Sequence, residues 1–350
     1  MTIHQAVLLV GCRGTRMWPL TATVPKGLLP VAGIPFLDLQ IRQLAAVGID
    51  EVFLAVGRFQ LREWQEFAKT RDGVRLVVED ERLDTAGPVL AALGDLDEHF
   101  LVLNGDVVIE ADLSGYLAAV QSDVKATLGL VEVMDTSAYG VAVLDGAGMV
   151  DRFVEKPPAD EAPAQTVNAG LYVMSRAALA PYGEGPLSFE RIVFPDLVAE
   201  GSLQGVVIAG TWLDIGTPEL FLNCTGAVLT GRTALLSPDS EHLVEGNCQG
   251  TTVGDWSWIA ADTSVDSGAV VEESVVLPGA VIGSKSIIRR AIIGWGATIG
   301  SDSIVTGATI VGAGASIGSN MKLDHGMRIA PGATLEPGAV TFSPPQQNLD

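Results

Sequence analysis

The chain has 350 residues, of which 48% are hydrophobic, and its formal net charge at pH 7 is −21. A strongly acidic protein repels nucleic acid and anionic lipid surfaces, and no apolar run reaches the roughly 18 residues that a membrane-spanning helix needs. The length exceeds the usual ceiling for one hydrophobic core and therefore favours two domains.

The cysteines give no sign of an oxidising compartment. Cys12, Cys224 and Cys248 are too few and too irregularly spaced for a disulfide framework or a zinc site. The first residues, "MTIHQAVLLVGCRG", have neither a basic start nor a small-residue cleavage site, so we expect no secretory signal. These features predict a cytoplasmic protein.

Short apolar runs alternate with longer, helix-period segments through the first 230 residues. The expected strands are "AVLLV", "EVFLAVG", "VRLVVED", "FLVLNGDVV" and "ATLGLVEV". Segments between them, such as "PFLDLQIRQLAAVGI", carry apolar residues at helical spacing. The alternation predicts an α/β domain at residues 1–230, built on a doubly wound, mainly parallel, Rossmann-like sheet.

The sequence pattern changes at residue 251. An aliphatic residue followed by a small one recurs about every six positions, as in "VLPGAVIGSKSIIRRAIIGWGATIGS". Such hexapeptide repeats indicate a parallel β-helix, because each coil buries its apolar face by stacking on the next. We expect this β-helix at residues 251–342, a linker at 231–250 and a disordered tail at 343–350.

The stretch "GCRGTRMWPL" is basic, although the chain as a whole is acidic. The first 37 residues hold Arg13, Arg16 and Lys26 and no carboxylate. A strand that runs into a glycine-rich turn presents backbone N–H groups to an anion, and Gly11 and Gly14 let the backbone approach a phosphate closely. The spacing matches neither the P-loop nor the dinucleotide-binding fingerprint. A strand-ending turn with solvated arginines is the alternative interpretation.

Two aspartates and one adjacent ion pair are further candidates. Asp106 directly follows an apolar strand in "LNGDVV", and Asp214 has a similar setting in "TWLDIGTPE". Two carboxylates with a bound polyphosphate suit Mg²⁺, although each aspartate alone is commonly a turn residue. Glu155 and Lys156 in "FVEKPPAD" precede two prolines that stiffen their loop. The alternative interpretation of Glu155 and Lys156 is a surface ion pair without a ligand.

Six motifs in order now resemble the sugar-1-phosphate nucleotidylyltransferases. They are "GCRGTRMWPLTATVPKGLLPV", "DTAGPVLAAL", "LNGDVV", "RFVEKP", "VNAGLYVM" and "TWLDIGTPE", followed by the hexapeptide repeats. The chain looks most similar to the mannose-1-phosphate guanylyltransferases, whose C-terminal β-helix is left-handed. The resemblance implies an enzyme that joins a nucleoside triphosphate, GTP by preference, to a sugar 1-phosphate with Mg²⁺ and releases pyrophosphate.

The resemblance also implies roles on the nucleotide side. Gly11, Gly14, Thr15 and Arg16 match the nucleotide-binding loop, with Arg16 on the leaving pyrophosphate and Lys26 on the phosphates near the reacting centre.

Thr85, Ala86 and Gly87 match a loop beside the nucleobase, and Asp106 and Asp214 match the Mg²⁺ ligands.

On the sugar side, the resemblance places Glu155 and Lys156 on the hydroxyls and the phosphate, with further contacts from Asn168 and the Gly140 backbone. A sugar-phosphate oxygen then attacks the α-phosphorus in line, without a covalent enzyme intermediate. The nucleophile is already an anion, so catalysis depends on alignment and charge neutralisation. The residues expected to be catalytic are Arg16, Lys26, Asp106, Lys156 and Asp214.

Two positions depart from the family pattern. Cys12 stands where the family usually has a second glycine, and Asp84 stands where it commonly has glycine beside the base-reading loop. A side chain at either position reshapes nucleotide binding if the backbone there needs positive φ. Both changes favour a specialised acceptor, such as an unusual hexose, heptose or cyclitol phosphate.

Two other classes of function stay open at this point. The first is a non-catalytic regulatory or scaffold subunit that binds a nucleotide sugar. The second is a β-helix acyltransferase that uses a histidine, for which His325 is the candidate within the repeats. We also expect the β-helix to assemble a homo-oligomer, because its ends and flat sheets need covering.

Overall fold

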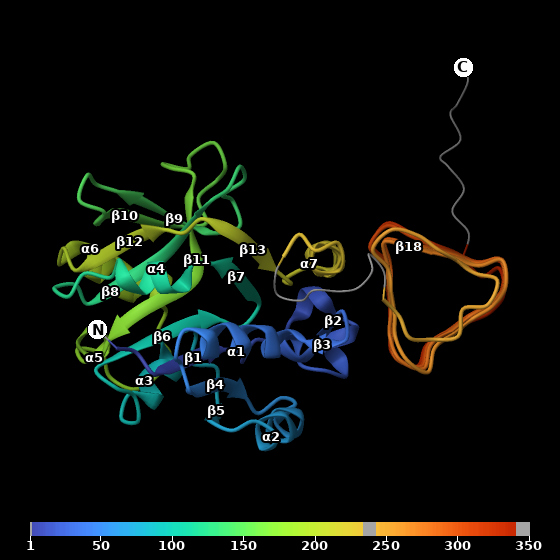
Figure 1. The fold of residues 1–350 in the computed structure, drawn as a ribbon, viewed down its shortest axis with the longest axis horizontal. Helices are drawn as coiled ribbons and strands as arrows, with labels where there is room; N and C mark the ends of the chain where they lie inside the picture. The colour runs from blue at the N-terminus through green and yellow to red at the C-terminus, as the bar shows by residue number, and fades with distance from the viewer. Residues whose placement is uncertain (1, 234–242, 341–350) are drawn as a thin grey trace. The chain divides into compact units, whose positions relative to one another are not determined.

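The computed structural model describes residues 2–233 and 243–340, which form two compact units. Unit 1 comprises Met1–Arg13 and Leu37–Leu213, and unit 2 comprises Gly14–Phe36 and Asp214–Asp350 (Figure 1). Within the described ranges, no helix is both long and apolar enough to cross a bilayer.

Unit 1 is built on one large sheet with the order β10-β9-β11-β6-β1-β4-β5, extended by β8 beside β11 and by β12 beside β8. The strands are β1 (Gln5–Leu9), β4 (Glu51–Gly57), β5 (Val74–Glu79), β6 (His99–Asn104), β8 (Ala126–Glu132), β9 (Gly140–Leu144), β10 (Val150–Glu155), β11 (Thr166–Ser175) and β12 (Leu203–Val207). The predicted parallel pairing is confirmed for β5-β4-β1-β6. Strand β11 is antiparallel to its neighbours, and β9 and β10 form a hairpin because only a short turn joins them.

Helices lie between the strands along the chain. They are α1 (Phe36–Ala46), α2 (Leu61–Lys69), α3 (Gly87–Ala92), α4 (Leu113–Ala118), α5 (Arg176–Leu179), α6 (Phe194–Ala199) and the π-helical turn η4 (Phe189–Val193). Helix α2 buries Trp64 and Phe67, three residues apart, and turns charged residues outward. The expected strand "FLVLNGDVV" is interrupted: β6 ends at Asn104, and β7 (Val107–Ala111) pairs separately with β13 (Gly210–Asp214).

The strand arrangement gathers several turns at one edge of the sheet. Parallel strands joined by crossovers all end on the same side, and that side is where open α/β sheets bind ligands. The turns after β1, β5 and β6 carry Gly11, Arg82 and Asp106, respectively.

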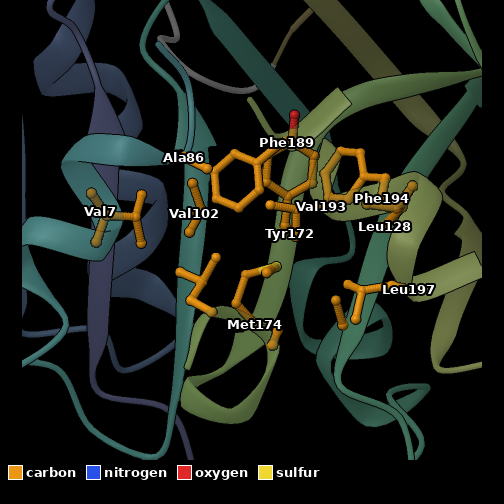
Figure 2. Close-up of a cluster of buried hydrophobic side chains, with 14 of the residues drawn as sticks. Val7, Ala86, Val102, Leu128, Tyr172, Met174, Phe189, Val193, Phe194 and Leu197 are labelled. Atoms are coloured by element: carbon orange, nitrogen blue, oxygen red, sulfur yellow. The ribbon is translucent and has the colours of Figure 1, made fainter. Parts of the chain in front are cut away.

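An aromatic cluster holds η4 against the sheet. Tyr172 on β11 lies 5.1 Å from Phe194, ring centre to ring centre, and Phe194 stacks on Phe189 at 5.5 Å. Phe153 on β10 packs on Phe194 at 5.4 Å. Figure 2 shows Tyr172, Phe189 and Phe194 beside the apolar side chains of the sheet. All three are fully buried, so their packing fixes the position of η4.

Unit 2 contains a turn-rich segment, one helix and the repeats. The segment carries η1 (Thr15–Met17), η2 (Leu20–Ala22), η3 (Lys26–Leu28), β2 (Pro30–Val31) and β3 (Ile34–Pro35), and the helix is α7 (Pro218–Leu229). The N-cap of α7 is Thr217, whose hydroxyl accepts a hydrogen bond from the backbone of Leu220.

The repeats form a parallel β-helix of three sheets, as the hexapeptide period predicts. The first sheet has β14 (Leu243–Val244), β16 (Trp258–Ile259), β19 (Val275–Val276), β22 (Ile292–Ile293), β25 (Ile310–Val311) and β28 (Arg328–Ile329). The second has β15 (Thr252–Val253), β18 (Val270–Glu272), β21 (Ile287–Arg289), β24 (Ile304–Val305) and β27 (Lys322–Leu323). The third has β17 (Ser264–Val265), β20 (Val281–Ile282), β23 (Thr298–Ile299), β26 (Ser316–Ile317) and β29 (Thr334–Leu335).

Successive coils are offset by 17 or 18 residues: Trp258 pairs with Val275, and Ile292 pairs with Ile310. This offset corresponds to one hexapeptide for each of the three sheets. Strand β14 lies in the range predicted as linker, but it pairs in parallel with β16 and so belongs to the β-helix stack. Residues 234–242 of that linker, residues 341–342 and the tail at 343–350 lie outside the described residues.

We predict that Phe194→Ala lowers the free energy of unfolding of unit 1 by about 3–5 kcal/mol, because it empties the centre of the aromatic cluster. Urea denaturation of the full chain measures this change. The control is Met134→Ala, whose side chain is 91% exposed and should matter by less than about 0.5 kcal/mol. Equal losses in the two variants would contradict the assignment of this cluster as the core.

Candidate active site

A cavity of about 380 Å³ with polar and apolar lining, here called cavity A, lies in unit 1 where the parallel strands end. Its lining residues include Gly11, Glu79, Thr85, Asp106, Lys156 and Glu190. The structure therefore brings predicted residues of four separate motifs to one cavity. Such a concave site at the carboxyl ends of parallel strands is the usual place for a ligand in an open α/β sheet.

Gly11 and Glu79 meet at the floor of cavity A. A Cβ atom on Gly11 would lie 2.6 Å from Oε1 of Glu79 and 3.4 Å from the carbonyl oxygen of Ala55, so a side chain does not fit there without a shift. Glycine at this position thus serves close packing against the carboxylate of Glu79.

Glu79 is a site residue that the sequence analysis missed. Its side chain is buried, and Oε2 accepts a hydrogen bond of 3.0 Å from the backbone N–H of Leu83. Burial raises the pKa of this carboxyl above its ordinary value of 4.5, while the Leu83 hydrogen bond and the charge of Arg82 partly lower it. The available signal was the acidic end of "VRLVVED", a carboxylate at the carboxyl end of a parallel strand.

Hydrogen bonds to residues 187–190 hold the turn at residues 85–87. The backbone N–H groups of Ala86 and Gly87 both donate to the carbonyl of Leu187, at 2.8 and 3.2 Å, and Ala86 is fully buried. Thr85 lines cavity A, and its hydroxyl donates to Oε2 of Glu190 at 2.8 Å. Thr85 is therefore the member of this turn that borders the cavity.

Asp106 stands on the wall of cavity A, in the turn between β6 and β7. The preceding Gly105 packs against Leu9, whose carbonyl oxygen would lie 2.8 Å from an added Cβ atom. In the described part of the chain, no group of three or more His, Cys, Asp or Glu side chains could hold a metal ion.

Glu155 and Lys156 form the ion pair that the sequence analysis gave as the alternative to a ligand-binding role, with Nζ of Lys156 2.8 Å from Oε1 of Glu155. Both line a second polar cavity of about 340 Å³, here called cavity B, and Lys156 lines cavity A as well. Lys156 has a φ of 46°, a left-handed conformation that turns the chain sharply before the two prolines. A lysine that borders both cavities can neutralise an anion in either.

Gly140 and Asn168 are not among the lining residues of the two cavities. A Cβ atom on Gly140 would lie 3.0 Å from Oε2 of Glu155, so glycine leaves room for that carboxylate. The amide of Asn168 donates to the hydroxyl of Tyr172 and accepts from the backbone of Gly170, both at 2.9 Å. Their predicted contacts with the sugar stay a prediction.

The two departures from the family pattern have different settings. Cys12 is exposed, lines cavity A and is not among the described residues with positive φ, so the position does not demand glycine. Asp84 has a φ of 64°, the left-handed conformation that glycine adopts most easily. Its carboxylate forms an ion pair with the guanidinium of Arg191.

The remaining predicted residues belong to unit 2. Gly14 has a φ of 57°, and an added Cβ atom would lie 3.0 Å from Cβ of Lys26, which is itself buried. Thr15 begins η1. Oδ1 of Asp214 accepts a hydrogen bond from the backbone of Gly216.

Arg16 lies beside the same turn of unit 2, because a Cβ atom on Gly216 would be 3.0 Å from its guanidinium. Unit 2 thus brings Gly14 together with Lys26, and Arg16 together with the turn that follows Asp214. His325, by contrast, lies on an exposed turn of the β-helix, next to Asp324.

A family model described as "Nucleotidyl transferase" matches residues 5–231. The chain belongs to the nucleotidyl transferase family. A second model, described as "GMPPB C-terminal domain", matches residues 239–340. Among curated members, the chain is 36% identical to a mannose-1-phosphate guanylyltransferase of Mycobacterium tuberculosis over 298 residues, which is 81% of each chain. It is 33% identical to mannose-1-phosphate guanylyltransferase 1 of Arabidopsis thaliana over 290 residues, 78% of this chain and 79% of that one.

Two solved structures share the fold of a large part of this chain. HddC from Yersinia pseudotuberculosis, complexed with GMP-PN, superposes with a TM-score of 0.56 at 25% identity and covers 64% of this chain and 98% of its own. A putative glucose-1-phosphate thymidylyltransferase from Bacillus anthracis superposes with a TM-score of 0.57 at 21% identity, covering 63% and 93%.

We predict that Glu79→Gln stabilises the folded chain at pH 7 and that the gain shrinks as the pH falls towards 4.5. The folded-state pKa of Glu79 is raised, so its contribution to stability is greatest below the unfolded value and is lost as the pH rises through the folded value. The amide removes the buried charge and still accepts the Leu83 hydrogen bond. Urea midpoints measured between pH 4 and 8 record the trend.

The matched control is Glu66→Gln, at an exposed glutamate whose pKa is lowered by its hydrogen bond to Lys69. This variant should show no gain at pH 7. A gain for Glu79→Gln that does not depend on pH would mean that burial of the charge is not its cause.

Proposed function

We propose that this chain is a sugar-1-phosphate guanylyltransferase, which joins GTP to a sugar 1-phosphate and releases pyrophosphate. The observation that carries the proposal is cavity A, where Gly11 of the phosphate loop, the Asp106 carboxylate and the Lys156 ammonium border one space. The names of the curated relatives support the same reaction type.

The carboxylate of Glu79 favours guanine. It lies on the floor of cavity A and can accept hydrogen bonds at both oxygens. Guanine presents two adjacent donors, the ring N1–H and the N2 amino group, which a single carboxylate can accept together. Adenine, uracil and thymine lack this pair, so Glu79 distinguishes GTP from the other triphosphates.

Asp106 is the residue of cavity A that would hold Mg²⁺; Asp214, the other ligand that the family resemblance implies, belongs to unit 2. When bound, Mg²⁺ neutralises charge on the triphosphate oxygens. The fit rests on the hard oxygen donor of Asp106, which lines cavity A together with the ammonium of Lys156. Arg16 and Lys26 keep their expected roles on the pyrophosphate and on the phosphates near the reacting centre.

The chemistry is one displacement at phosphorus. A phosphate oxygen of the acceptor forms a bond to the α-phosphorus as the bond between that phosphorus and the bridging oxygen of the β-phosphate breaks, and the electron pair leaves with pyrophosphate. Lys156 stabilises the negative charge that gathers between the two phosphates, and Glu155 orients the ammonium through its ion pair. No general base is needed, because the attacking oxygen is already ionised.

The acceptor class is a sugar 1-phosphate, with mannose 1-phosphate the first candidate and a modified hexose, heptose or cyclitol phosphate the alternative. Glu155 provides acceptors for sugar hydroxyls at cavity B. We further propose a cytoplasmic homo-oligomer assembled through the β-helix.

Pyrophosphate release with Mg²⁺ tests the proposal, using five nucleoside triphosphates against a panel of sugar and cyclitol 1-phosphates. We expect release with GTP and at least one acceptor, and a fall of at least about 10³-fold in kcat for Asp106→Ala, because the variant loses its metal ligand. Silence across the panel in a chain that binds a nucleotide sugar would favour a regulatory subunit. Consumption of a CoA thioester that depends on His325 would favour an acyltransferase.

We predict that Glu79→Gln lowers kcat/KM for GTP about 10- to 100-fold, the loss expected for a hydrogen bond to a charged group. Turnover of ATP and UTP should change much less, so the preference for GTP narrows. The control is Glu81→Gln, an exposed glutamate two residues further on, which should leave kcat/KM unchanged. Equal losses with all triphosphates would show that Glu79 supports the cavity without reading the base.

A further inference from the structure

Asp84 is a departure from the family pattern that base recognition does not explain, and its surroundings point to a second role. Its carboxylate borders both cavities and pairs with Arg191, which borders cavity B and stands 107 residues further along the chain. Arg191 belongs to η4, the turn that the aromatic cluster holds against the sheet. The ion pair therefore joins the wall of cavity A to a rigid element at cavity B.

The two segments are also connected beneath this ion pair. The carbonyl of Leu83 accepts a hydrogen bond from the backbone of Leu187 at 3.0 Å, and the hydroxyl of Thr85 accepts one from the backbone of Phe189 at 2.9 Å. Oε2 of Glu190 accepts from the hydroxyls of Thr85 and Ser188, at 2.8 and 3.0 Å. The backbones at residues 83–87 and 187–190 are thus fixed without the Asp84–Arg191 pair.

The pair must therefore serve the side chain of Arg191. That side chain is 67% exposed, and an unrestrained arginine at such a site samples many rotamers in water. Here Asp84 binds one terminal nitrogen, and Nε lies 3.4 Å from the hydroxyl of Ser188. A guanidinium has five N–H donors in a planar fork, so one held at two points can still donate towards a ligand.

We propose that Arg191 is a further acceptor-binding residue and that Asp84 is the positioning residue that holds its guanidinium at cavity B. This inference rests on the proposed function, in which cavity B takes the sugar phosphate. Arg191 donates to oxygen atoms of the acceptor on a wall of the cavity that also carries Ser188, while Lys156 serves the reacting phosphate.

Charge accounts for the choice of residue at position 84. A glycine would adopt the φ of 64° more easily but would leave the guanidinium unrestrained. Aspartate is also one of the few side chains that tolerate this conformation.

Three variants of the full chain test the proposal: Asp84→Asn, Arg191→Gln and the double variant. Asparagine keeps the shape of aspartate and tolerates positive φ, so the first variant removes the charge alone. We expect each single variant to raise the KM of the acceptor about tenfold, the loss of one charge-assisted hydrogen bond, with the KM of GTP unchanged within about twofold. The double variant should be no worse than Arg191→Gln, because both changes remove the same contact.

The control is Glu200→Gln, which breaks the Lys125–Glu200 ion pair of similar exposure, outside both cavities, and should change neither KM. Additive losses in the double variant, or a KM for GTP that rises as much as that of the acceptor, would overturn the proposal.

A titration without metal gives a readout independent of turnover. Calorimetry with mannose 1-phosphate, glucose 1-phosphate and myo-inositol 1-phosphate should show about tenfold weaker binding to Asp84→Asn than to the wild type, for whichever compound binds. Inorganic phosphate serves as a further probe: weaker binding to Arg191→Gln assigns the guanidinium to the phosphate, and unchanged binding assigns it to the sugar hydroxyls. Wild-type binding without pyrophosphate release would refute the proposed function alone. Binding that no variant weakens, or the absence of any binding, would refute this inference.

Discussion

Parallel pairing of β1 with β4 and β6 is the constraint on which the rest of unit 1 depends. Because these strands run in one direction, the turns that follow them end at the same edge of the sheet. Gly11, Glu79 and Asp106 lie 27 or more residues apart in sequence, yet they border one cavity. No local interaction among the three could assemble them; the backbone hydrogen bonds of the sheet do so.

A second constraint acts on the other wall of the cavities. The aromatic cluster around Tyr172 and Phe194 fixes η4, and η4 in turn presents Glu190 and Arg191. Packing in the apolar core therefore positions Glu190 and Arg191, which lie at the edge of that core and face the cavities. Carboxylates and cations line cavity B together because they form ion pairs: Glu155 with Lys156, and Asp84 with Arg191.

The acidic chain and its anionic substrates are compatible for the same reason. A net charge of −21 repels phosphates at long range, but screening confines that repulsion to about 8–10 Å at physiological salt. Inside the cavities the charges that count are local: Lys156 is set against Glu155, and Arg191 against Asp84. Burial of Glu79 beside Gly11 keeps this carboxylate, the group that we propose reads the base, away from bulk water.

Local pattern in the sequence was enough for the strand and helix alternation, the hexapeptide coils, and the motifs that carry Gly11, Asp106 and Lys156. These features depend on residues close together in the chain, where periodicity and turn chemistry act directly. Only the tertiary structure decided which polar groups remain for a ligand. The N–H groups of Ala86 and Gly87 are taken by Leu187, and Asp84 is paired with Arg191, each across about a hundred residues. Burial and partner choice depend on the packed chain, so sequence periodicity cannot reveal them.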